Sequence, residues 1–142
     1  GFTACVSNET LACTTFSGLK QEQEVNLEKS LRANQGIDGH LVSGHVDGIG
    51  SVSSVEKDGD SVRIQIEAQN EIVKYIAKKG SICINGVSLT VNRVVKNIFD
   101  VNIVPHTLSA TTLADLSLNS NVNLEIDQIA RYVERLLSQN EE

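Results

Sequence analysis

The sequence has 142 residues, 40% of them hydrophobic, and a net charge of −6 with a pI near 5.0, which fits one ordinary domain with its own core. No apolar run reaches the about 18 residues that span a bilayer, and residues 1–15 lack the pattern of a signal peptide. The sequence also has no cluster of basic residues that would offset the acidic charge, as a nucleic-acid site requires. Three cysteines without a C-x-x-C pair favour free thiols in a reducing compartment, so we expect a soluble, cytoplasmic protein.

The first segment of the chain, residues 2–28, repeats without a gap at 99–125, an offset of 97 residues at which ten of the 27 aligned positions are identical. The identical pairs are Phe2/Phe99, Thr10/Thr107, Leu11/Leu108, Thr14/Thr111, Thr15/Thr112, Leu19/Leu116, and the run Val25–Glu28 with Val122–Glu125. We therefore expect a module that is complete over 30–127 and represented only by its tail in 1–29, with about 60 residues of the first copy absent. Two unrelated strand–turn–strand segments are the alternative.

The complete module begins with two β-rich runs, 40–58 and 60–69, joined by the turn sequence KDGD. We expect GHLVSGHVDG (39–48) to form the first strand of the module. In the second run Val62, Ile64 and Ile66 alternate with polar residues, as in a strand with one buried face. Residues 70–80 predict a short helix that begins at Asn70 as N-cap and ends before Gly80.

Further strands are predicted on both sides of the turn signal Asn85-Gly86, and again at 99–105 and 121–127. About six short strands with one helix predict a mainly β fold, a small closed barrel. The tail differs, because Ile129, Val133, Leu136 and Leu137 share one face of an amphipathic helix over 128–139. That face packs either on the barrel or on another subunit.

Four groups of polar residues are candidates for chemistry. His40 and His45 lie five residues apart, which puts them on opposite faces of a strand and argues against a shared metal ion. We therefore expect His40 to be structural and His45, beside Gly44, to approach a ligand. In the strand after Gly86, Ser88 and Thr90 share a polar face that either meets solvent or offers hydroxyls to a ligand.

The other two groups lie near the end of the module. Glu125 and Asp127 share one face of a strand, either solvated or as an acid–base pair. The segment VPHTLSATTL (104–113) places threonines after Pro105, which suits a ligand-binding loop at a barrel rim or a plain turn.

Four of these motifs, GHLVSGHVDG, KGSICINGVSLTV, VPHTLSATTL and VNLEID, occur in the order in which the riboflavin synthase family has them, and the chain closely resembles that family over nearly its whole length. The resemblance implies a closed six-stranded antiparallel β-barrel with a short helix and a C-terminal amphipathic helix. It assigns 1–29 to the tail of a truncated N-terminal lumazine-binding barrel, 30–127 to a complete C-terminal barrel, and 128–142 to a helix through which subunits trimerise. The family's reaction, without metal or cofactor, turns two 6,7-dimethyl-8-ribityllumazine molecules into riboflavin and 5-amino-6-ribitylaminouracil.

Carried over residue by residue, the resemblance assigns a set of catalytic and a set of substrate-binding positions. The catalytic set is His45, Lys79, Ser88, Glu125 and Asp127, and the binding set is Gly44, Thr90, Val104, Thr107 and Thr10, the last as the N-barrel counterpart of Thr107. Asn85 stands where relatives often have an aspartate, so no acid role is expected there.

The resemblance also implies that two lumazines meet between barrels of neighbouring subunits. We therefore expect this chain alone to bind ligand and to be weakly active or inactive. A non-catalytic lumazine- or flavin-binding protein is the main alternative. An oligosaccharide or oligonucleotide binder is disfavoured by the acidic charge and an aromatic content of 4%.

Overall fold

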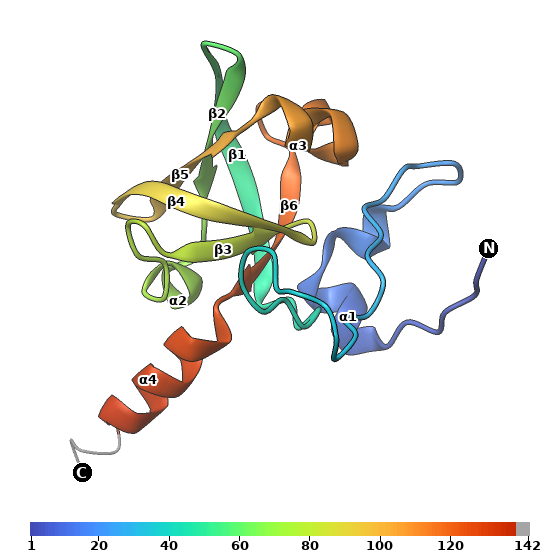
Figure 1. Cartoon of the computed structure of the whole chain (residues 1–142), viewed down its shortest axis with the longest axis horizontal. Coiled ribbons are helices and arrows are strands. Elements are labelled where there is room, and N and C mark those ends of the chain that lie inside the picture. The colour runs from blue at the N-terminus through green and yellow to red at the C-terminus, as the bar shows by residue number, and fades with distance from the viewer. Residues whose placement is uncertain (139–142) are drawn as a thin grey trace.

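The computed structural model describes residues 1–138 and contains a closed antiparallel barrel flanked by helical segments (Figure 1). The strands are β1 (Gly48–Asp58), β2 (Ser61–Glu67), β3 (Ser81–Ile84), β4 (Val87–Val95), β5 (Ile98–Ile103) and β6 (Asn121–Ile126). Around the barrel they follow the order β1-β2-β5-β4-β3-β6, and β6 pairs with β1 to close it. This confirms the barrel predicted from the sequence.

Local sequence explains the hairpins. Asn85 and Gly86 both have positive φ, 49° and 83°, which is the conformation of the two-residue turn that matches strand twist between β3 and β4. Gly59, with φ 62°, begins the turn between β1 and β2 at the predicted place. Both hairpins therefore follow from a few neighbouring residues.

The core fills the barrel with branched aliphatic side chains from alternating strand positions. Ile64 and Ile66 are fully buried, while Arg63 before them and Glu67 after them are exposed, as the predicted alternation requires. The largest fully buried side chains are Phe99, Ile64, Ile66, Ile82, Ile84, Ile103, Leu113, Leu124, Ile126, Val52, Val91 and Val101. A closed, well-filled interior leaves ligand binding to the outer face and the rim.

Two sequence predictions of secondary structure are wrong in extent. The stretch 39–47 forms no strand, and β1 begins only at Gly48. Gly39 and Gly44 have φ of 95° and 78°, which breaks the extended conformation. The predicted helix 70–80 is limited to α2 (Asn70–Val73), with Gln69 rather than Asn70 as N-cap.

Two pairs of short helical segments have the same conformation. The first pair is α1 (Asn8–Cys13) with the 3-10 turn η1 (Thr15–Gly18), and the second is α3 (Pro105–Ala110) with η2 (Thr112–Asp115). All four bounds are offset by 97 residues, the offset of the sequence repeat. In both pairs a threonine hydroxyl, Thr14 or Thr111, donates to the carbonyl four residues earlier, at 2.6 and 2.7 Å. The sequence repeat is therefore also a structural repeat.

The last helix, α4 (Gln128–Ser138), projects from one end of the barrel (Figure 1). Glu134 accepts hydrogen bonds from Lys74 and Tyr75, and Arg131 pairs with Asp47 at 2.7 Å. The predicted apolar face is largely exposed, at Ile129, Val133, Leu136 and Leu137. Residue 139 of the predicted helix and residues 139–142 of the predicted oligomerisation segment lie outside the described residues.

Candidate functional site

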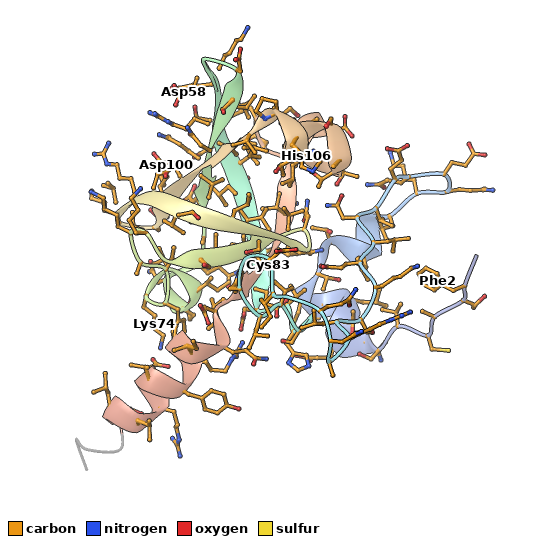
Figure 2. The ribbon with its side chains drawn as sticks, viewed as in Figure 1. Phe2, Asp58, Lys74, Cys83, Asp100 and His106 are labelled. Atoms are coloured by element: carbon orange, nitrogen blue, oxygen red, sulfur yellow. The ribbon has the colours of Figure 1, made fainter. Side chains whose placement is uncertain are left out.

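The outer face of β4, β3 and β6 carries a row of polar side chains. Strand pairing puts Cys83 of β3 between Ser88 of β4 and Glu125 of β6, and Ser81 opposite Thr90. The alternate residues of these strands point into the core, so the row faces outward. Cys83 and Glu125 are nevertheless buried, because the segment 39–47 crosses this face (Figure 2).

Glu125 holds that covering segment in place. Its Oε1 accepts hydrogen bonds from the backbone N–H of Ser43 at 2.7 Å and from the Ser43 hydroxyl at 2.9 Å. Its Oε2 accepts from the N–H of Gly44 at 3.0 Å. These donors replace the water that a buried carboxylate loses, and both of its oxygens are occupied by the segment 39–47.

A second anchor lies at Ser88, and it involves a residue that the sequence argument set aside. The Ser88 hydroxyl oxygen lies 2.7 Å from Nδ1 of His40 and accepts the His40 backbone N–H at 3.3 Å. Gly39 permits this approach, because a Cβ there would stand 2.5 Å from the Ser88 oxygen. His40 therefore contacts Ser88, one of the predicted site residues.

The two anchors explain why the five-residue spacing of His40 and His45 does not follow strand alternation. Both residues lie in an irregular segment held by side chains more than 40 residues away. The glycines Gly39 and Gly44 were the available signal, since glycine in such a motif marks a positive φ or a close approach. Ser43, a second contact residue, carried no signal of its own.

Between the anchors lies the thiol of Cys83. Burial, followed by the negative charge of Glu125, raises the pKa of Cys83 to about 12. The thiol is therefore protonated at neutral pH and is a poor nucleophile, because the thiolate is the reactive form.

The remaining predicted residues are placed around this cluster rather than in it. Thr90 is exposed on β4, His45 is exposed in the segment 39–47, and Lys79 is exposed just before β3, with φ 67°. Asp127 follows β6 and accepts the N–H of Ile129 at 2.9 Å, so its carboxylate caps the start of α4.

Three predicted residues lie on the repeated helical segments or next to them. Val104 precedes α3 and is exposed, Thr107 is half-buried within α3, and Thr10 occupies the equivalent place in α1. The Thr10 hydroxyl lies 3.0 Å from that of Ser7, and its N–H donates to the same side chain at 3.1 Å. The structure thus gathers Gly44, Ser88 and Glu125, while Thr10 stays within its own segment.

Two surface hollows lie away from this cluster. They measure about 310 and 350 Å³. The first is lined by Ile49, Gly50, Ser51, Glu67, Ala68, Gln69, Asn70, Asn97 and Asn121, and the second by Gln65, Arg93, Val95, Lys96, Asn97, Ile98, Phe99 and Asp100. Neither contains a predicted site residue, so we place the site by its hydrogen bonds rather than by the size of a hollow.

Two further properties bear on the function. Over residues 1–138, no group of three or more His, Cys, Asp and Glu side chains is arranged to hold a metal ion. None of the helices in that range has the length and apolar character that crossing a bilayer demands.

Comparison with known proteins gives consistent matches. A family model described as the lumazine binding domain matches residues 43–127. Riboflavin synthase of Photobacterium leiognathi is 44% identical over 137 residues, which cover 96% of this chain and 63% of that protein. Riboflavin synthase of Mycobacterium bovis is 36% identical over 139 residues, or 96% of this chain and 69% of that protein. The chain thus spans less than two thirds of the first of these relatives.

Solved structures of the protein LumP share the fold. In complex with riboflavin, LumP gives a TM-score of 0.75 at 28% identity, covering 83% of this chain and 64% of LumP. In complex with 6,7-dimethyl-8-(1'-D-ribityl) lumazine, it gives 0.73 at 25% identity, covering 84% and 63%.

Proposed function

Since this chain belongs to the lumazine binding domain family, we propose that it is the ligand-binding barrel of a riboflavin synthase. In the proposed reaction two molecules of 6,7-dimethyl-8-ribityllumazine exchange a four-carbon unit and yield riboflavin and 5-amino-6-ribitylaminouracil. Relatives named riboflavin synthase at 35–46% identity support the reaction, and the lumazine and riboflavin complexes of LumP support the ligands.

The observation that carries the proposal is the covered polar face of β4, β3 and β6. Hydroxyls at Ser88 and Thr90, next to the anchored segment 39–47, suit the carbonyl and ring-nitrogen edge of a heterocycle or the hydroxyls of a ribityl chain. Gly44, Val104 and Thr107 complete the proposed binding surface. Two ring systems held face to face would gain most of their acceleration from proximity and orientation.

The proposed chemistry needs proton transfer more than it needs a cofactor. One lumazine loses a proton from its C7 methyl group, and the other accepts a nucleophile at C7. His45, Lys79 and Asp127 are the proposed proton-transfer groups, since each has a titratable side chain that is at least partly exposed. For Glu125 we propose a positioning role instead, because the segment 39–47 occupies both carboxylate oxygens.

We assign residues 1–29 to a second barrel of the same kind. Phe2 is 76% exposed and Leu27 71%, while their repeat partners Phe99 and Leu124 are 1% and 0% exposed in the core. Figure 2 shows Phe2 on a segment away from the barrel. Residues 1–29 thus carry apolar side chains that pack into no core. The missing strands of a second barrel would supply that core. In this proposal Thr10 is the second barrel's counterpart of Thr107.

The exposed apolar face of α4 supports a homotrimer of the full-length protein, joined through this helix. Free cysteines at positions 5, 13 and 83 support a cytoplasmic location. Light scattering on the full-length protein measures its oligomeric state. Loss of the trimer in the Leu137→Glu variant is the expected result.

The test of the proposed function has two arms. Fluorescence titration of this 142-residue chain with 6,7-dimethyl-8-ribityllumazine is expected to show saturable binding, weakened in Ser88→Ala and unchanged in Ser54→Ala, a serine of β1 outside the cluster. Riboflavin formation is expected to be weak or absent with this chain and present with a full-length protein. Absence of binding contradicts the ligand, and robust turnover by this chain contradicts the need for a second barrel.

A second candidate function is a non-catalytic lumazine- or flavin-binding protein. It is favoured by the likeness to LumP. The structure of LumP in complex with flavin mononucleotide matches this chain with a TM-score of 0.72 at 25% identity. Binding of lumazine and riboflavin without turnover by the full-length protein is the result that selects this candidate.

A further inference from the structure

We propose that His40 is a positioning residue that turns Ser88 into a pure hydrogen-bond donor toward the ligand. The inference rests on the proposed function, in which Ser88 lies against lumazine. It assigns His40 a role that neither its spacing from His45 nor the family comparison gives, and it excludes Ser88 as the nucleophile.

The surroundings of the Ser88 oxygen are built for close approach. The His40 backbone N–H donates to this oxygen at 3.3 Å, and the imidazole Nδ1 lies 2.7 Å from it. Gly39 has φ of 95°, and a Cβ at this position would clash with both Oγ and Cβ of Ser88. Backbone and ring of one residue therefore converge on a single hydroxyl, and glycine at position 39 makes the convergence sterically possible.

The other ring nitrogen decides which tautomer fits. His40 Nε2 is buried and has no hydrogen-bond partner among residues 1–138. A buried N–H without an acceptor is rarer, and costs more, than a buried lone pair without a donor. The neutral imidazole therefore carries its hydrogen on Nδ1, and Nδ1–H donates to the Ser88 oxygen.

This tautomer fixes the chemistry of the serine. A hydroxyl oxygen has two lone pairs and one hydrogen, and both lone pairs of Ser88 then accept from His40. The remaining O–H can only donate, and because Ser88 is half-exposed a ligand can offer it a carbonyl oxygen, a ring nitrogen or a ribityl oxygen. An oxygen whose lone pairs are engaged is a poor nucleophile, so the nucleophile at C7 is water or a ligand hydroxyl.

The tautomer is measured without any ligand. Long-range ¹H–¹⁵N correlation spectra of the ¹⁵N-labelled chain at pH 7.5 distinguish the two neutral tautomers, and His45→Ala and His106→Ala assign the His40 signals by elimination. The Nδ1–H pattern at His40 is the expected result. An Nε2–H pattern, or the averaged pattern of an exposed histidine, overturns the proposal whatever the chain binds.

The second arm measures lumazine affinity in position 40 variants. His40→Leu removes the ring donor, and we expect it to weaken binding about tenfold, as loss of one hydrogen bond does. His40→Asn can return an N–H near the Nδ1 position, and we expect it to regain most of that loss. Equal weakening in both variants overturns the donor role. If the wild-type chain binds no lumazine, the proposed function fails while the tautomer assignment stands on the spectra.

Discussion

The backbone N–H of Thr15 donates a 2.8 Å hydrogen bond to the side-chain oxygen of Asn123, a residue 108 positions later in the chain. The equivalent residues under the 97-residue repeat are Thr112 and Asn26, and the N–H of Thr112 donates to the Asn26 side-chain oxygen at 2.9 Å. Each repeat thus uses its asparagine to bind the threonine of the other. Such an exchange of identical contacts is the property of a local two-fold axis, so residues 14–26 are attached to the barrel by a symmetric contact.

We expect Asn123→Ala to release the segment around Thr15. The variant leaves a half-buried N–H without its acceptor and should lower the free energy of unfolding by about 1 kcal/mol. Amide hydrogen exchange at Thr15 should accelerate. Asn121→Ala, an exposed neighbour on the same strand, is the matched control. Unchanged exchange at Thr15 would contradict the contact.

Replacement of Glu125 by glutamine tests the anchor of the segment 39–47. The amide puts a donor where Gly44 offers its own N–H, and it removes the charge that strengthens the bonds from Ser43. We expect a loss of about 3 kcal/mol in urea unfolding. The control Glu56→Gln changes an exposed carboxylate that accepts from Ser54 and should cost far less. Equal losses in the two variants would argue against the anchor.

Gly39→Ala and Gly59→Ala separate backbone strain from steric clash. Both glycines have positive φ, but a Cβ at 39 would clash with Ser88 whereas a Cβ at 59 meets open space. Gly59→Ala should therefore show the strain alone, about 1 kcal/mol. Gly39→Ala should cost more in thermal unfolding and also displace His40 from Ser88, with weaker lumazine binding. Equal destabilisation with intact binding is the outcome that rejects this view.

The buried thiol predicts an alkaline dependence of stability. The pKa of Cys83 is raised from 9.0 to about 12 by burial and then by the charge of Glu125. The folded-state pKa of the thiol lies above the unfolded value. The stability that the protonated thiol contributes to the folded state is therefore fully present below pH 9 and is lost as the pH rises toward 12.

The comparison of wild type with Cys83→Ala isolates this effect. Their difference in free energy of unfolding should shift against the wild type as the pH rises above 9. At pH 8, iodoacetamide should label the exposed Cys5 and leave Cys83 unmodified in the folded chain, as read by mass spectrometry. Fast labelling of Cys83 would place it outside the covered face.

Local signals account for the parts of the fold that the sequence predicted correctly. The Asn85-Gly86 turn and the alternation of Ile64 and Ile66 with polar residues depend on neighbours in the chain, so short-range rules suffice. The repeat also marks 8–18 and 105–115 as equivalent segments, but both form a helix and a 3-10 turn, whereas the sequence predicted a rim loop or a plain turn at 104–113.

The candidate site was only partly predictable, because its geometry depends on distant pairs. The segment 39–47 is shaped by Glu125 and Ser88, which lie 82 and 48 residues away from their partners Ser43 and His40. A periodicity argument assumes a regular strand and cannot weigh such contacts. Spacing alone therefore gives no sign of the contacts that His40 and Ser43 make.

The closure of the barrel also restricts how this protein can meet another one. Each of the six strands has a partner on both sides, and the stretches paired on one side only are short, such as 55–58 of β1 beyond its pairing with β6, so little backbone edge is left on which a foreign strand could add. Recognition then relies mainly on side chains of the loops and helices. A contact of this kind can change partner through a few surface substitutions while the sheet beneath it remains the same.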